Sequence, residues 1–401
     1  MTDKVFVWAP DLFSNTGGIQ AFSRYFLEAL LMETAEKEIR VLVKNDYPKD
    51  LPQNNESYRV SACGDWPVRV RSPRFALGCL TETWLERPSL IVSTHLHFGP
   101  VAQLARSCFG TPYVLVAHGI DAWGLNNESR LRSLQKANLV LAVSHYTRDR
   151  LINETGLDAN RVKILPNTFS QERFKIAPKS PQLLRRYGLQ ATTRVILTVG
   201  RLADTEGYKG YDQIIRALPR ILHALPDVRY LLVGKGSDRP RIEKLIAEVG
   251  VQEAVILAGF VPDEELADHY NLCDIFAMPS QAEGFGIVYL EALACGKPVL
   301  AGNKDGSRDA LADGELGLLV DPDDTAKIAA EIISVLRREH SHPKIFYPEI
   351  LRQQVIELFG FNAFRRTVAD RLSSFLDHEE VRIEGVLGDP QEAIVSRTGD
   401  Y

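Results

Sequence analysis

The chain has 401 residues, of which 45% are hydrophobic and 25% charged, a composition typical of a soluble globular protein. This length exceeds one ordinary hydrophobic core and predicts two domains of the usual size. A net charge of -5 argues against a general nucleic-acid-binding protein, because such proteins carry a basic excess.

Five cysteines are widely spaced and form neither a CxxC pair nor a metal-ligand cluster, which indicates reduced, cytosolic thiols. The apolar run at residues 5–10 is too short for a signal peptide, and no apolar segment approaches the ~20 residues of a membrane span. The amino-terminal half is rich in arginine, whereas residues 377–401 are acidic. A basic face of this kind suits peripheral contact with anionic lipid or an acidic acceptor, although a solvated surface would have the same composition.

The chain opens with a predicted strand at residues 5–9, a loop and an amphipathic helix. Gly17 and Gly18 stand at the start of this helix. Without Cβ atoms, they would let a phosphate approach the backbone, although an ordinary turn also uses such a pair.

Further apolar strands are predicted at residues 39–43, 90–93, 113–117 and 139–143, and helical or irregular segments separate them. Apolar strands that alternate with helices indicate a parallel, doubly wound sheet. Ligands on such sheets bind at the carboxyl ends of the strands. The loops at 45–73 and 119–132 follow no pattern that we can interpret.

Polar residues follow two of these strands. His95 and His97 could ligate a metal, but no third ligand is near in the sequence, so a position in a cleft wall fits better. His118 and Asp121 come next, and His118 could equally be a capping or core histidine. Ser144, at the end of another strand, is interpreted as the N-cap of the following helix.

A polar run at residues 171–181 reads as a linker, and the strand predicted at 195–199 restarts the alternation. The predicted organisation is a Rossmann-like domain at 1–170, a second at 171–355, a helix at 356–376 and a loosely ordered acidic tail at 377–401.

Two cations lie between the strand at 195–199 and the next helix. Arg201 offers a planar fork and Lys209 a point charge, the two usual partners of phosphate oxygens. Taken alone, they could also be surface cations on a loop.

The stretch at residues 279–298 predicts a strand end, a glycine-containing loop and a short helix. Glu291 is the one charge in a helix that is otherwise apolar all round and therefore buried, so its carboxylate needs a partner. Glu291 lies about 7 Å along the axis from Gly286. An anion at the first-turn amides would thus place an adjoining sugar beside Glu291. Alternatively, Glu291 pairs with a core cation and Glu283 is a solvated loop acid.

This stretch resembles the Glu-x7-Glu motif of retaining glycosyltransferases of family 4, which have the GT-B fold, through Glu283, Phe285, Gly286 and Glu291. The resemblance implies an α/β protein with two Rossmann-like, doubly wound parallel sheets that face each other across a cleft. It also implies that the last helix crosses back to the first domain.

The resemblance further implies roles for individual residues. The phosphate clamp would consist of Arg201 and Lys209. His118 and Glu283 would be catalytic residues that contact the donor sugar. Donor binding would involve Gly17, Gly18, Val261, Phe285, Gly286, Ile287 and Glu291, with Glu291 on the ribose. Asp121 would lie near the acceptor. The segment from Arg201 to Lys209 is longer than the family's usual spacing, which leaves the path of this loop open.

The implied activity is a cytoplasmic, retaining glycosyl transfer that needs neither metal nor cofactor. The donor would be a nucleoside-diphosphate sugar, with UDP favoured over GDP and ADP, and the acceptor a hydroxyl of a glycan, lipid-linked sugar or small sugar. The alternatives are a non-catalytic nucleotide-sugar binding protein, a sugar-nucleotide epimerase and a phosphorylase. A nicotinamide dehydrogenase is disfavoured, because its Gly-x-Gly-x-x-Gly fingerprint follows neither the strand at 5–9 nor the strand at 195–199. The oligomeric state stays open.

Overall fold

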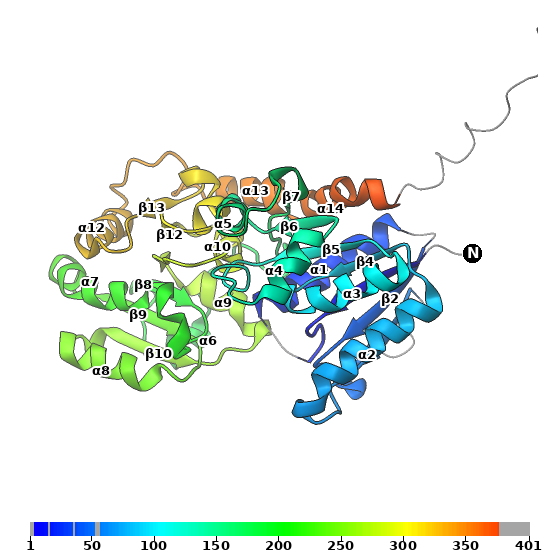
Figure 1. Cartoon of the computed structure of the whole chain (residues 1–401). Helices are drawn as coiled ribbons and strands as arrows, with labels where there is room; N and C mark the ends of the chain where they lie inside the picture. The colour runs from blue at the N-terminus through cyan, green and yellow to red at the C-terminus, as the bar shows by residue number, and fades with distance from the viewer. Residues whose placement is uncertain (1–3, 15–16, 35–36, 53–56, 377–401) are drawn as a thin grey trace, which may run out of the picture.

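The computed structural model describes residues 4–14, 17–34, 37–52 and 57–376, arranged as two lobes that each contain a sheet (Figure 1). The predicted acidic tail at 377–401 lies outside the described residues. Among the described residues, no helix is both long and apolar enough to cross a bilayer.

The first lobe holds a parallel sheet of seven strands in the order β3-β2-β1-β4-β5-β6-β7. Its strands are β1 (Lys4–Ala9), β2 (Glu38–Val43), β3 (Tyr58–Ala62), β4 (Leu90–Ser93), β5 (Tyr113–Ala117), β6 (Leu139–Ala142) and β7 (Val162–Ile164). The strand order reverses beside β1, as in a doubly wound sheet. β3 was not predicted, because this edge strand is half-buried and mixes polar with apolar residues.

The second lobe holds a parallel sheet of six strands in the order β10-β9-β8-β11-β12-β13. Its strands are β8 (Arg194–Val199), β9 (Val228–Val233), β10 (Val255–Gly259), β11 (Ile275–Met278), β12 (Val299–Gly302) and β13 (Leu318–Val320). Two parallel sheets with covering helices confirm the predicted α/β architecture.

The helices of the first lobe are α1 (Gly18–Glu33), α2 (Val68–Glu86), α3 (Gly99–Phe109), α4 (Glu128–Lys136) and α5 (His145–Thr155). Those of the second are α6 (Pro181–Arg186), α7 (Tyr211–Ala224), α8 (Arg239–Val249), α9 (Asp263–Leu272), α10 (Ile287–Ala294), α11 (Ser307–Ala310) and α12 (Thr325–Leu336). Ser144 caps α5 as predicted, since its hydroxyl accepts a 3.0 Å hydrogen bond from the amide of Thr147.

Two further helices, α13 (Pro348–Phe359) and α14 (Phe361–Leu376), end the described chain. α13 packs against α10, and α14 packs against α1 of the first lobe. The rings of Phe22 and Phe364 meet edge to face at 5.7 Å, and Arg371 donates to the carbonyl of Ile164 at 3.3 Å. Figure 1 shows α14 beside the amino-terminal elements. The exact domain boundaries stay predictions.

Candidate active site

Two helices begin opposite each other where the lobes meet. A Cβ built on Gly18, the first residue of α1, would lie 4.0 Å from Cδ1 of Ile287, the first residue of α10. Neither helix has a side-chain N-cap or an acid in its first turn. The structure thus brings the Gly17–Gly18 turn and the Gly286–Ile287 turn together. Uncapped helix N-termini present free N–H groups and a positive dipole end, an arrangement suited to an anion.

The loop that leads to Gly17 is held by a buried acid that the sequence analysis missed. Asp46 follows β2 and is fully buried. Its carboxylate accepts hydrogen bonds from the amides of Leu12 at 2.7 Å, Phe13 at 3.1 Å and Ser14 at 2.8 Å. The approach to the α1 turn is therefore fixed by tertiary contacts.

The loop between β11 and α10 contacts the first lobe through its backbone. A Cβ on Gly284 would stand only 1.8 Å from the carbonyl oxygen of His118, and one on Gly119 would stand 2.7 Å from the Cα of Gly284. The hydroxyl of Thr147 donates to the carbonyl of Gly284 at 3.3 Å. The lobes meet here at a distance that only glycine permits.

Asp305 shapes the same loop from within the second lobe. This buried carboxylate accepts hydrogen bonds from the Ser280 hydroxyl at 2.7 Å, the Glu283 amide at 2.7 Å and the Ser307 amide at 3.0 Å. Burial raises the pKa of Asp305, and these donors oppose the shift. Asp305 carries no signal in the sequence, because its partners converge through tertiary structure.

Three of the predicted catalytic residues form one ionic cluster, together with a glutamate that was not predicted. Lys209 Nζ lies 2.6 Å from Oε1 of Glu283 and 3.7 Å from Oε2 of Glu206, and Arg201 pairs with the other oxygen of Glu206. Burial by itself would lower the pKa of Lys209, but Glu283, Tyr208 and Glu206 raise it overall. Lys209 is therefore a fixed cation.

Arg201 and Lys209 differ in exposure. The Arg201 side chain is 78% exposed and can reorient toward a ligand, whereas that of Lys209 is 12% exposed and fixed. Glu206, inside the long segment noted in the sequence, occupies the space between the two cations. A negatively charged ligand would have to compete with it.

Glu291 is 8% exposed, and the predicted alternative of a pairing with a cation is present. Its Oε2 accepts a 2.7 Å hydrogen bond from the hydroxyl of Tyr270, and Oε1 lies 3.6 Å from Nη2 of Arg173. Burial raises the pKa of Glu291 to about 7, against the opposing effects of Tyr270 and Arg173. Tyr270 lies in the core, and its hydroxyl orients Glu291.

His118 follows β5 and lies at the contact between the lobes. Its Nε2 is 2.8 Å from the carbonyl oxygen of Thr94, and its ring meets that of Phe22 edge to face at 4.9 Å. A ring nitrogen bonded to a carbonyl must carry the proton, so Nδ1 of the neutral imidazole is a hydrogen-bond acceptor. His118 therefore binds the Thr94 carbonyl rather than capping a helix, and it is half-buried rather than fully in the core.

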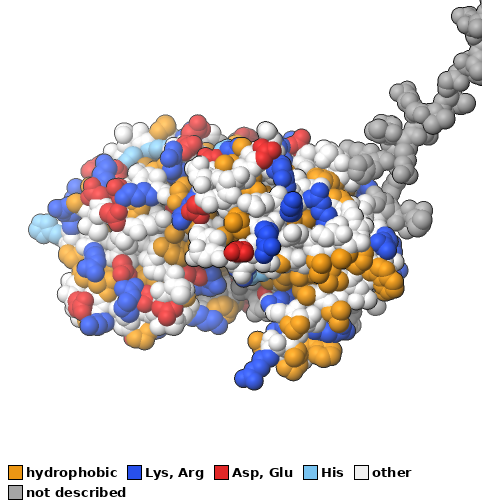
Figure 2. Space-filling model, in the orientation of Figure 1, with side chains coloured by type: hydrophobic (Ala, Val, Ile, Leu, Met, Phe, Trp, Pro, Cys, Tyr) orange, Lys and Arg blue, Asp and Glu red, His pale blue; other side chains and the backbone are white. Residues whose placement is uncertain are grey.

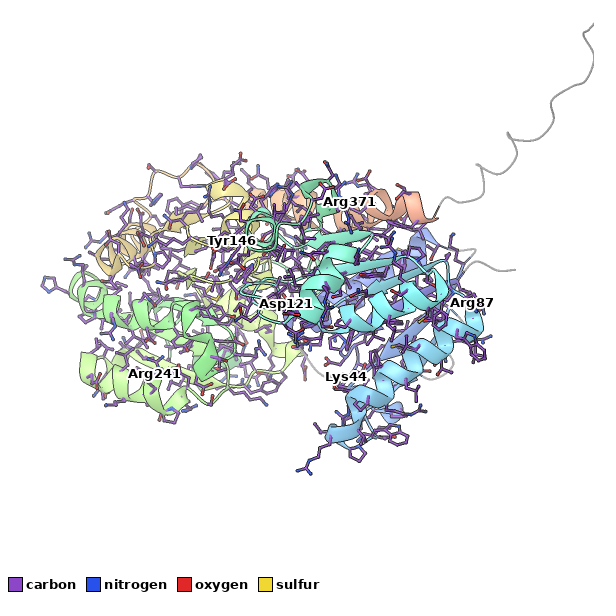
Figure 3. The ribbon with its side chains drawn as sticks, in the orientation of Figure 1. Lys44, Arg87, Asp121, Tyr146, Arg241 and Arg371 are labelled. Atoms are coloured by element: carbon purple, nitrogen blue, oxygen red, sulfur yellow. The ribbon has the colours of Figure 1, made fainter. Side chains whose placement is uncertain are left out.

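Asp121, His95 and His97 form a polar group beside His118. The rings of His95 and His97 stack at 4.2 Å, and His95 Nδ1 lies 4.0 Å from Oδ2 of Asp121. Burial, and then the neighbouring His118 and His97, lower the pKa of His95 to about 3. Burial raises the pKa of Asp121, whose Oδ2 has no hydrogen-bond partner among the described residues. Figure 3 shows Asp121 where the lobes meet.

The remaining predicted side chains, Phe285 and Val261, are buried. Phe285 is 2% exposed and packs on Phe359 of α13 at 5.5 Å, so only its backbone can face a ligand. Val261 follows β10 and is 9% exposed. Within the described parts of the chain, no group of three or more His, Cys, Asp or Glu side chains is placed to hold a metal ion.

Two glycosyltransferase family models match this chain. Residues 17–168 match the model of the glycosyl transferase 4-like domain, and residues 180–349 match that of glycosyl transferases group 1. The chain belongs to the GT-B glycosyltransferases of family 4. As a family-4 member, it carries the helix-start turn at Gly17 in one matched region and the Glu283–Glu291 stretch in the other.

Two curated relatives illustrate the kinship. The GDP-mannose-dependent alpha-(1-6)-phosphatidylinositol monomannoside mannosyltransferase of Mycolicibacterium smegmatis is 35% identical over 59% of this chain and 64% of its own. The D-inositol 3-phosphate glycosyltransferase of Acidothermus cellulolyticus is 28% identical over 80% of this chain and 72% of its own. The matches therefore span roughly two thirds of these relatives' lengths.

Among solved structures, HepE of Anabaena in complex with UDP and glucose superposes with a TM-score of 0.75. It covers 93% of this chain and 100% of its own, at 22% identity. At that identity the likeness supports the GT-B fold alone.

Proposed function

We propose that this family-4 member is a retaining glycosyltransferase that needs no metal and transfers a sugar from a nucleoside-diphosphate sugar to a hydroxyl acceptor. The observation that carries the proposal is the convergence of two uncapped helix starts, at Gly18 and Ile287, at the junction of the two lobes. Arg201 and Lys209 supply the positive side chains. Together these groups suit a pyrophosphate.

The chemical step breaks the bond between the anomeric carbon and the β-phosphate oxygen, and the departing diphosphate takes the bonding electrons. Lys209, Arg201 and the amides at the start of α10 stabilise this developing negative charge. Such groups act most strongly when they are already in place and water is excluded. Lys209 meets this condition, because its side chain is 12% exposed and fixed by Glu283.

Retention follows if the acceptor oxygen attacks from the same face as the leaving group. The acceptor hydroxyl then gives its proton to the departing phosphate oxygen while the new C–O bond forms. Glu283 and the backbone of Phe285 and Gly286 would hold the donor sugar. Nδ1 of His118 would accept a hydrogen bond from one of its hydroxyls, because Nε2 donates to Thr94.

The ribose of the donor would bind at Glu291. One of its oxygens accepts from Tyr270, so the ribose hydroxyls would share this carboxylate with Tyr270 and Arg173. The base would lie near Val261. One relative is named for GDP-mannose and one fold neighbour holds UDP, so both bases belong in the test beside ADP.

The acceptor would bind beside Asp121, His95 and His97 in the first lobe. Arg130 and Lys44 are close enough to lower the pKa of both histidines, although burial contributes more. A positive potential of this kind favours an acceptor that carries a phosphate or another anionic group. The names of the two curated relatives include a phosphatidylinositol mannoside and an inositol phosphate.

The test is a donor screen followed by a variant. UDP, GDP and ADP are compared by thermal shift, since stabilisation grows with ligand concentration over Kd, and the matching nucleotide sugar is assayed for release of nucleoside diphosphate. Lys209→Ala should lower kcat by about 10²–10³-fold, the usual effect of removing one such donor. Tight nucleotide binding without donor turnover would favour a non-catalytic binding protein, and a donor isomerised at the sugar would favour an epimerase.

A further inference from the structure

Helix α2 of the first lobe has apolar residues on two opposite faces. Phe75, Cys79 and Thr83 are spaced four residues apart, and their face is buried against the sheet at 3%, 0% and 0% exposure. The outer face carries Val70, Leu77 and Trp84, which are 45%, 58% and 55% exposed. Residues seven apart drift by only ~20° around a helix, so these three form one outward stripe.

Neighbouring residues extend this stripe into a surface, which we call the α2 surface. It consists of the exposed apolar residues Trp66, Val68, Val70, Leu77, Trp84, Leu85 and Leu104. Figure 2 shows hydrophobic side chains gathered over the lower right of the molecule, where Figure 1 places α2. Contiguous exposed apolar side chains of this kind mark an interaction site.

The exposed charges around the α2 surface are mostly cations, with one exposed acid, Asp65, beside Trp66. Arg69, Arg74 and Arg87 are exposed, and Arg74 lies over the ring of Trp66 at 5.3 Å. The two acids of the helix are engaged on its inner side: Glu82 pairs with Arg40 at 2.6 Å and Glu86 with Lys4 at 2.8 Å. The helix therefore shows arginine, tryptophan and aliphatic groups to solvent.

We propose that the α2 surface docks on membranes that contain anionic lipid. Tryptophan and leucine would enter the interface between headgroups and acyl chains, while the arginines meet lipid phosphates, the division found in interfacial helices. A second protein chain fits less well, because a ring of arginine without outward acids on the helix favours a uniformly negative partner.

The topology connects this docked surface with the candidate active site. β3 ends at Ala62 and α2 begins at Val68, so the start of α2 lies at the carboxyl edge of the sheet, where the acceptor would bind. The amide of Gly64 donates to the carbonyl of Asp46 at 2.8 Å, and Asp46 holds the loop before Gly17. A membrane at the α2 surface would therefore lie on the side from which a lipid-linked acceptor could enter.

The test is sedimentation of the full chain with vesicles of phosphatidylcholine alone, or with about a third phosphatidylglycerol. We expect binding to the anionic vesicles, weaker binding at high salt, and a blue shift of fluorescence because Trp66 and Trp84 are exposed. Arg69→Glu/Arg74→Glu should lower the bound-to-free ratio by about tenfold or more, since each charge near the surface contributes about fivefold. Leu77→Asn/Trp84→Asn should lower it similarly.

Matched controls come from the second lobe. Ile350→Asn/Leu358→Asn changes two residues of α13 that are 42% and 50% exposed, and Arg216→Glu/Arg220→Glu changes two exposed arginines of α7. Both should bind vesicles as the parent chain does, and circular dichroism confirms that all variants are folded. Three results would overturn the proposal: no vesicle binding, binding that the α2 variants leave unchanged, or a solution dimer that Leu77→Asn/Trp84→Asn dissociates. None of them depends on turnover, so the proposed catalytic function is tested separately.

Discussion

At the residue scale, the role proposed for Glu291 would link stability to nucleotide binding. Its pKa is raised by burial to about 7 in the folded chain, against an ordinary value of about 4.5. The folded state therefore binds this proton more tightly than the unfolded state, and the free energy of unfolding falls as pH rises from about 4.5 to about 7. Above pH 7 the ionised carboxylate costs the fold about 3 kcal/mol. Ribose hydroxyls donate hydrogen bonds, so a ribose site needs the ionised carboxylate of Glu291 as their acceptor.

The corresponding prediction concerns Glu291→Gln. At pH 8 we expect the variant to be more stable than the parent chain by up to about 3 kcal/mol, with the difference shrinking toward pH 5. At pH 8 its affinity for nucleoside diphosphate should fall at least about tenfold, because a charged acceptor of hydroxyl hydrogen bonds is lost. Urea unfolding at both pH values and calorimetric titration check the two parts. An unchanged affinity would remove Glu291 from the nucleotide site.

Glu206 gives a second prediction at this scale. Because it pairs with both Arg201 and Lys209, it would compete with a ligand phosphate for the same cations. Glu206→Gln should therefore tighten nucleoside diphosphate binding by about two- to fivefold, the range expected of a partly exposed ion pair. Glu243→Gln, which breaks the exposed pair with Arg239 on α8, is the control and should leave the affinity unchanged. Weaker binding in Glu206→Gln would indicate instead that Glu206 positions the cations.

At the element scale, the turn into α10 depends on Asp305. Its carboxylate holds Ser280, the Glu283 amide and Ser307, so Asp305→Asn places an amide group where only acceptors fit. We expect a loss of about 2–3 kcal/mol in unfolding free energy, the cost of leaving buried donors unpaired, and a lower kcat/KM for the donor. Asp313→Asn, at an exposed pair with Arg308, should change neither. Wild-type kinetics in Asp305→Asn would show that the loop keeps its shape without this acid.

The burial of individual strands and side chains explains which parts of the fold and site could be predicted from the sequence. Buried parallel strands such as β5 and β12 read as continuous apolar runs, so the two-sheet fold could be predicted. The site stretch was recognisable because glycines and one acid interrupt an apolar helix start. Asp46, Glu206 and Asp305 escaped prediction, since their partners come from other parts of the chain. β3 escaped prediction because this edge strand is half-buried, so its sequence mixes polar with apolar residues.

At the scale of the whole molecule, the two lobes touch through backbone contacts and side-chain hydrogen bonds near the candidate site. Besides the Gly284–His118 approach, Nδ1 of His145 lies 2.6 Å from Oδ1 of Asp309 across the junction. α14, returning to α1, joins the lobes a second time. In the proposed function, the donor groups of the second lobe would act on an acceptor in the first only if this contact forms.

Gly284→Ala tests that requirement. A Cβ at this position would collide with the His118 carbonyl at 1.8 Å, so the lobes would have to separate. We expect turnover to fall by at least about a hundredfold, since small misplacements of reacting groups have costs of this size, while circular dichroism stays unchanged. Gly78→Ala, with no atom within 4 Å of the added Cβ, is the control. Normal turnover in Gly284→Ala would mean that the active arrangement does not use this contact.

The central claim is that the helix starts at Gly18 and Ile287, together with Arg201 and Lys209, bind a pyrophosphate. Calorimetric titration of the parent chain and of Lys209→Ala with a nucleoside diphosphate and its monophosphate tests it most directly, using the base that gives the largest thermal shift. The account predicts that the parent chain binds the diphosphate at least about tenfold more tightly than the monophosphate, and that Lys209→Ala largely removes this preference. Equal affinities for the two nucleotides, or a preference that Lys209→Ala leaves intact, would contradict it.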